Sequence, residues 1–156
     1  MEISNRNGKP RGLGLLCFMA EAKPALVFFL DKNNILDLIK DHRHSVLKFV
    51  FNRETNRLVV SLDLDIKHRR MARDFFMTTR SNIIFGAEIT FSKTNDEFEF
   101  KFEGESCFFD RPPDRHFLEV AEHIKEVLSS IGIDPVIEIR GGSFLVKGDL
   151  RGVIWK

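Results

Sequence analysis

Hydrophobic and polar residues alternate along several stretches of the chain, which is the pattern of β-strands with one buried face. The clearest case is 97–103, where Phe98, Phe100 and Phe102 share one face and charged residues share the other. Turn-forming residues separate these stretches at short intervals, so we expect neighbouring strands to pair antiparallel. The predicted strands are 13–19, 25–30, 46–51, 58–66, 83–91, 97–103, 136–140, 143–147 and 152–155.

A second pattern, with apolar residues three or four positions apart, predicts helices. It is strongest over 114–131, which begins at Asp114, a good N-cap, and is followed by Gly132, a good residue just after a helix. A shorter apolar stripe predicts a helix at 35–39. Over 67–79, the pairs Met71–Phe75 and Ala72–Phe76 favour a short helix, and an extension of the preceding strand is the alternative.

Together these patterns predict an α+β fold. We expect a mainly antiparallel sheet, one long amphipathic helix (114–131) packed on its Phe-rich face, and one or two short helices. The chain has 156 residues, of which 43% are hydrophobic and 30% charged, as in one ordinary globular domain. Residues 1–12 are polar and basic and are expected to form a flexible arm. Residues 13–156 are expected to form the single domain.

Net charge and the length of apolar runs limit the classes of partner, and cysteine content indicates the cellular compartment. The formal net charge is +1, so binding to nucleic acid or to an anionic membrane requires a local patch. The longest apolar runs are too short to span a bilayer, and we find no secretory signal peptide, so no membrane partner is expected. Cys17 and Cys107 are few and distant, which indicates reduced thiols and a cytoplasmic protein.

The hairpin over 83–103 carries a candidate site. A four-residue loop at 92–95 would place Glu88 directly opposite Glu99, with Lys101 diagonal to Glu88. Like charges that face each other destabilise a sheet unless a cation lies between them. Lys101 is one such cation, and a Mg²⁺ ion held by the carboxylates of Glu88 and Glu99 is another.

An acid on one strand followed by Glu-x-Lys on the next resembles the core of the PD-(D/E)xK nuclease superfamily. The resemblance rests on Phe-Gly-Ala-Glu88 and Phe-Glu99-Phe-Lys101-Phe, and on a similar order of elements from the helix at 35–39 to the strand at 136–140. It implies that Glu88 and Glu99 hold a metal while Lys101 steadies the attacking water or the transition state. Glu replaces Asp as the first acid, and no Pro precedes it.

A basic segment gives a different candidate. Lys67, Arg69, Arg70 and Arg73 lie within seven residues and are followed by Arg80. Such a cluster is typical of a solvated face with ion pairs, and phosphate contacts with nucleic acid are the alternative. Acidic residues on the predicted sheet, among them Asp63 and Asp65, make the open sheet a poor platform for RNA.

The sequence therefore supports three functions. The first is a non-catalytic cytoplasmic binding or accessory domain that acts through a protein partner or through self-association at its sheet edges. The second is a metal-dependent nuclease that uses Glu88, Glu99 and Lys101. The third is a nucleic-acid-binding protein without catalysis that uses Lys67, Arg69, Arg70 and Arg73. The sequence leaves open whether the protein is an enzyme. No cofactor is expected except Mg²⁺ under the nuclease alternative.

Overall fold

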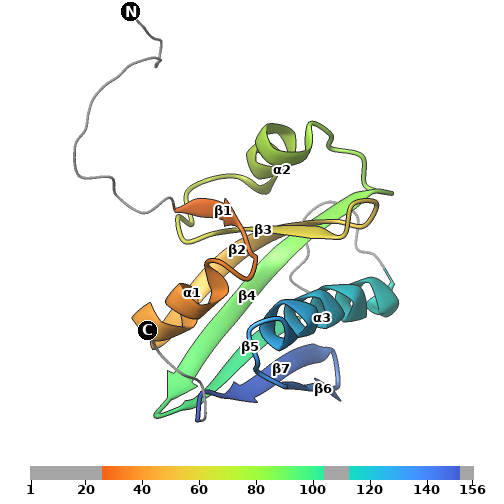
Figure 1. The fold of residues 1–156 in the computed structure, drawn as a ribbon. Coiled ribbons are helices and arrows are strands. Elements are labelled where there is room, and N and C mark those ends of the chain that lie inside the picture. The colour runs from red at the N-terminus through yellow and green to blue at the C-terminus, as the bar shows by residue number, and fades with distance from the viewer. Residues whose placement is uncertain (1–25, 104–112, 152–156) are drawn as a thin grey trace, which may run out of the picture.

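The computed structural model describes residues 26–103 and 113–151. Within them, seven strands form one antiparallel sheet in the order β1-β3-β2-β4-β5-β7-β6 (Figure 1). The strands are β1 (Val27–Phe29), β2 (His44–Asn52), β3 (Arg57–Ser61), β4 (Ile84–Thr94), β5 (Glu97–Glu103), β6 (Val136–Arg140) and β7 (Ser143–Asp149). The helices are α1 (Ile35–Asp41), α2 (His68–Phe76) and α3 (Asp114–Ser129). The fold is therefore of the predicted α+β class.

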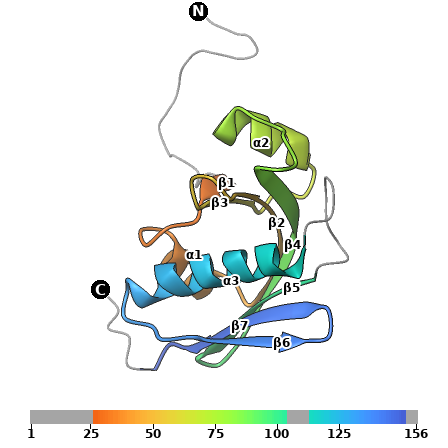
Figure 2. The ribbon, with the colours of Figure 1, turned by 90° about the vertical axis from the view of Figure 1, so that its right-hand side faces the viewer.

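One face of the sheet, which we call the inner face, carries the main hydrophobic core. Alternate residues of β2, β3, β4, β5 and β7 pack there against α1 and α3, which both lie on the concave side of the sheet (Figure 2). Phenylalanine rings fill much of this space. Phe85 meets Phe117 of α3 edge to face at 5.2 Å, and Phe102 stacks on Phe144 at 5.8 Å. Such ring pairs add to the stabilisation that comes from burying apolar area.

The opposite face, which we call the outer face, is covered by a described helix at one end only. α2 packs there over a smaller cluster that contains Val50 of β2, Val59 of β3 and Ile84 of β4. Both views show α2 apart from the other two helices (Figures 1 and 2). At the other end, over β5 and β7, the outer face carries alternating charged residues and no described helix.

The segment 58–79 differs from one prediction and resolves another. The strand predicted over 58–66 is wrong beyond Ser61, where β3 ends. The Ser61 hydroxyl donates a hydrogen bond to the Asp63 carbonyl (2.8 Å) and accepts one from the Asp63 N–H (3.0 Å), which turns the chain out of the sheet. Asp63 and Asp65 therefore do not belong to the sheet face. The ambiguous segment is helical over His68–Phe76.

Elsewhere the predicted elements and the structure differ in detail. Asp114 is the first residue of α3 rather than its cap, since Pro113 precedes it in extended conformation. The arm 1–12, the strands 13–19 and 152–155, Cys17 and Cys107 lie outside the described residues. Among the residues that the structure describes, no helix is long and apolar enough to cross a membrane.

Candidate functional site

The helix α2 is fixed to the outer face by an apolar stripe. Met71 and Ala72 are fully buried against the sheet. One turn later, Phe75 and Phe76 both meet the ring of Phe29 on β1 edge to face, at 5.3 and 5.6 Å. These four side chains follow the helical period and therefore leave the opposite side of α2 to solvent.

The first residue of α2, His68, anchors the start of the helix. Its side chain is buried, and its Nε2 lies 2.9 Å from the carbonyl oxygen of Ala87 on β4. The neighbouring Gly86 leaves room for the imidazole. A Cβ at position 86 would lie 2.8 Å from His68 Cδ2 and 2.6 Å from the Phe49 carbonyl oxygen. Glycine within a strand thus permits the close approach of a side chain from another element.

The environment of His68 keeps its imidazole neutral. Burial lowers the pKa of His68, and the nearby Lys48 lowers it further, while the contact with the Ala87 backbone and the charge of Glu88 act in the opposite direction. Lys48 also donates a hydrogen bond from Nζ to the Ile66 carbonyl at 2.8 Å. The loop that leads into α2 is therefore tied to β2 as well as to β4.

The solvent side of α2 is strongly basic. Lys67, Arg69, Arg70, Arg73 and Arg80 are all exposed, and we call these five residues the basic face. On a helix of 3.6 residues per turn, Arg69, Arg70 and Arg73 project on the side opposite Met71 and Ala72. The carboxylate of Asp74 lies 3.3 Å from Arg70, and both side chains are open to water. An exposed pair of this kind screens only part of the positive charge.

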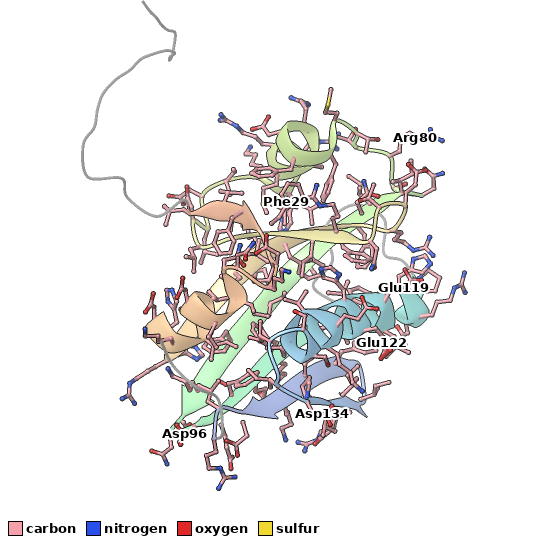
Figure 3. The ribbon with its side chains drawn as sticks, viewed as in Figure 1. Phe29, Arg80, Asp96, Glu119, Glu122 and Asp134 are labelled. Atoms are coloured by element: carbon pink, nitrogen blue, oxygen red, sulfur yellow. The ribbon has the colours of Figure 1, made fainter. Side chains whose placement is uncertain are left out.

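Positive charge is concentrated around α2. Residues 67–80 carry a formal net charge of +4, although the whole chain carries only +1. Arg80 lies beyond α2, between this helix and β4, whereas Asp96 lies at the far end of β4 and β5 (Figure 3). Glu119 and Glu122 lie on α3, away from α2 (Figure 3). Anions should therefore be attracted more strongly to α2 than to the rest of the described surface.

The predicted pairing of Glu88 with Glu99 is wrong. The β4–β5 turn has two residues, Asn95 and Asp96, rather than four, and Asn95 adopts the left-handed conformation (φ 57°) that such a turn requires. In this register Glu99 lies opposite Ser92. Ser92 is four positions further along β4 than Glu88, which is about 13 Å along a strand.

Lys101 lies opposite Thr90 and so stays diagonal to Glu88 as predicted, but the two carboxylates face other residues. Glu88 pairs across the sheet with Lys48 of β2. Glu99 pairs with Lys147 of β7, and Lys101 with Leu145 of the same strand. Opposite charges that face each other stabilise a sheet without any metal. Among the described residues, no group of three or more acidic, histidine or cysteine side chains could hold a metal ion.

Described residues line several hollows away from α2. One, of about 470 Å³, lies over the outer face of β5 and β7 and is lined by Glu97, Lys147 and Asp149 among others. The second, of about 450 Å³, lies between α3 and the loop after β1 and includes His123 and Glu126. Burial lowers the pKa of His123, and Glu126 and the Leu30 backbone oppose this shift. Both hollows are wide open to solvent, unlike the pockets that enclose small ligands.

No family model, no curated protein and no solved structure matches this chain. The basic face is the candidate site, within the part of the chain that the structure describes, on which the sequence pattern and the geometry agree. Sequence reasoning identified its residues but missed the contact between His68 and Gly86. The glycine inside an otherwise apolar strand pattern was the signal that could have revealed it.

Proposed function

We propose that this protein is a non-catalytic binding domain that holds the phosphate backbone of a nucleic acid against the basic face. The observation that carries this proposal is the placement of Arg69, Arg70 and Arg73 together on the solvent side of one short helix. Had these cations been scattered over different faces, no single anionic strand could contact them together.

Arginine suits this role because its planar guanidinium can donate two parallel hydrogen bonds to one phosphate. Four of the five cations of the basic face are arginines. Arg69 and Arg73 are one helical turn apart, about 6 Å along the axis, so both can reach the same polyanion. The apolar side chains of α2 support this arrangement by holding the helix rigidly on the sheet.

The proposed contact is with the backbone rather than with unstacked bases. Binding to single strands relies on aromatic rings that stack on bases. The rings nearest to the basic face, Phe75 and Phe76, are partly buried and engaged with Phe29. We therefore expect weak preference for sequence and strong dependence on salt.

Fluorescence anisotropy with a labelled DNA duplex of about 20 base pairs tests the proposal. It measures the affinity at several salt concentrations and the length of duplex that one protein occupies. For the wild type, the plot of log affinity against log salt concentration should have a slope of up to about −4.5, since five cations are available. The double variant Arg69→Ala/Arg73→Ala should bind at least about tenfold more weakly and should lose about two units of slope.

The double variant Arg43→Ala/Arg115→Ala is the matched control. Both arginines are exposed and lie outside α2, so this variant removes the same net charge from other surfaces. It should bind the duplex nearly as well as the wild type. Equal losses in the two double variants, or no binding by the wild type at low salt, would rule out the basic face as a nucleic-acid site.

An acidic segment of a protein is a second candidate partner. The observation in its favour is Met77, which is 88% exposed at the end of α2. Arg and Met are both enriched in protein–protein interfaces, whereas an exposed Met adds little to phosphate contacts. Binding of a poly-glutamate peptide that Met77→Ala weakens, without a matching loss for the duplex, would favour the protein partner.

A further inference from the structure

The two edges of the sheet differ in how far they are protected. β1 at one edge has three residues, and an edge strand this short offers few backbone groups to another chain. β6 at the other edge has five residues, Val136–Arg140, and all five pair in unbroken register with β7. No strand within residues 26–103 and 113–151 pairs with its other side, which therefore presents a regular row of backbone donors and acceptors.

β6 also has few of the features that usually protect an edge strand, although it carries the charged residues Glu138 and Arg140. The unbroken register leaves no β-bulge, and the strand contains neither Lys nor Pro. Two of its apolar side chains are open to water, Val136 at 59% and Ile139 at 56%. Among the described residues, only Leu26, Leu64 and Met77 are other large hydrophobic side chains with comparable exposure.

The strand is complementary to a second copy of itself. Glu138 and Arg140 lie on the outer face of β6, where the two carboxylate oxygens of Glu138 accept from Arg140 (2.8 Å) and from Lys147 (3.4 Å). If two copies of β6 pair antiparallel about a two-fold axis at Ile139, Arg140 of one copy lies opposite Glu138 of the other. Ile139 then meets Ile139 of the other copy on the inner face.

We propose that two copies of this chain associate through antiparallel pairing of their β6 strands, which joins the two sheets into one. The contact is small, so the dimer is expected to be weak and reversible. It would leave α2 free at the opposite edge of each sheet, and it does not depend on the proposed nucleic-acid function. A pair of basic faces in one particle would strengthen binding to a long polyanion through multivalency.

Sedimentation equilibrium of the full 156-residue chain tests this pairing over a wide range of concentrations. The wild type should show a reversible monomer–dimer equilibrium. Ile139→Lys should raise its dissociation constant by at least about tenfold, because a lysine on each copy of the edge adds repulsion where apolar contact was. Leu64→Lys is the matched control, since Leu64 is 46% exposed and lies outside β6, and it should associate like the wild type.

A second test exchanges the charges of Arg140 and Glu138, so it does not depend on whether Ile139→Lys disturbs folding. Arg140→Glu should weaken the dimer, and the second change Glu138→Arg in the same chain should restore part of the loss. A wild type that stays monomeric at every concentration overturns the proposal and leaves the edge open to an extended peptide of another protein. A dimer that Ile139→Lys and Arg140→Glu leave intact overturns it as well.

Discussion

The outer face of the sheet has one end that α2 covers and another end that is open, and the two differ in the side chains of the strands beneath. Under α2, the outer positions of β2, β3 and β4 include Val50, Val59 and Ile84, which are fully buried. At the open end, the outer positions of β5 include Glu99 and Lys101, which remain partly exposed. Apolar outer positions need a cover, whereas charged ones stabilise the sheet in contact with water.

The difference accounts for the position of the proposed binding surface on the helix and not on the sheet. At the covered end, the helix turns its apolar stripe inward and thereby concentrates cations on its other side. At the open end, charges of both signs face each other across the strands, as with Glu99 and Lys147. Such pairs largely cancel at a distance, so the open end presents a weaker field to a charged partner.

Loss of a buried side chain at the covered end is expected to have the largest effect. Met71→Ala should reduce the free energy of unfolding by about 2–5 kcal/mol, because it leaves a cavity between α2 and the sheet. Urea unfolding measures the change. The matched control is Met77→Ala, which truncates an 88% exposed methionine on the same segment and should change stability by less than about 0.5 kcal/mol. Similar losses in both variants would mean that α2 is not packed as described.

A smaller loss is expected where the helix touches the sheet most closely. Gly86→Ala should destabilise the protein by about 1–3 kcal/mol, because the added Cβ would collide with the Phe49 carbonyl and with the ring of His68. The signals of α2 in an NMR spectrum should shift more than those of β5. A variant as stable as the wild type would contradict the close contact between His68 and β4.

His68, at the covered end, should also make the free energy of unfolding depend on pH. Burial lowers the pKa of His68 in the folded state, while in the unfolded chain this residue takes up a proton near its ordinary pKa of about 6.5. The unfolded state therefore binds more protons as the pH falls below about 6.5. The free energy of unfolding should decline there, with a slope of up to about 1.4 kcal/mol per pH unit for this residue.

Urea unfolding at several pH values between about 7.5 and 5 covers this window. His68→Gln should flatten the decline, although His123 and His116, whose pKa values are also lowered by burial, should leave a residual slope. If stability rises as the pH falls through this range, the neutral, buried state of His68 is wrong.

The smallest effect is expected at the open end. Glu99→Ala should change the free energy of unfolding by no more than about 0.5 kcal/mol, as for most surface substitutions. Calorimetric titration of the wild type with Mg²⁺ should give no binding isotherm that this variant removes, because Glu88 and Glu99 lie apart. A Mg²⁺ isotherm that disappears in the variant would restore the metal-dependent alternative.

The sequence reveals which residues of a strand share a face but not which residues of two strands meet. The predicted four-residue turn and the observed two-residue turn both place apolar residues of β4 opposite apolar residues of β5. Ile89, for example, faces Phe98 in the predicted register and Phe102 in the observed one. Registers that differ by an even number of positions satisfy the same alternation. The predicted carboxylate site is wrong for this reason, because it depended on which residues of the two strands face each other.

Predicting the basic face required less information about the fold. Its residues lie within one local segment, so the helical period alone places Arg69, Arg70 and Arg73 on one side once Met71 and Ala72 are buried. The position of α2 on the outer face, and the contact of His68 with Gly86, involve residues far apart in the chain. A single sequence carries no direct record of such contacts.

The central claim is that α2, and not the open end of the sheet, contacts a polyanion. The most direct measurement is an NMR titration of the isotopically labelled protein with a short DNA duplex, followed through the backbone amide signals. The account predicts that the largest shifts fall on residues 67–80 and that β5 and β7 are little affected. Shifts concentrated on β5 and β7, or none at low salt, would contradict it.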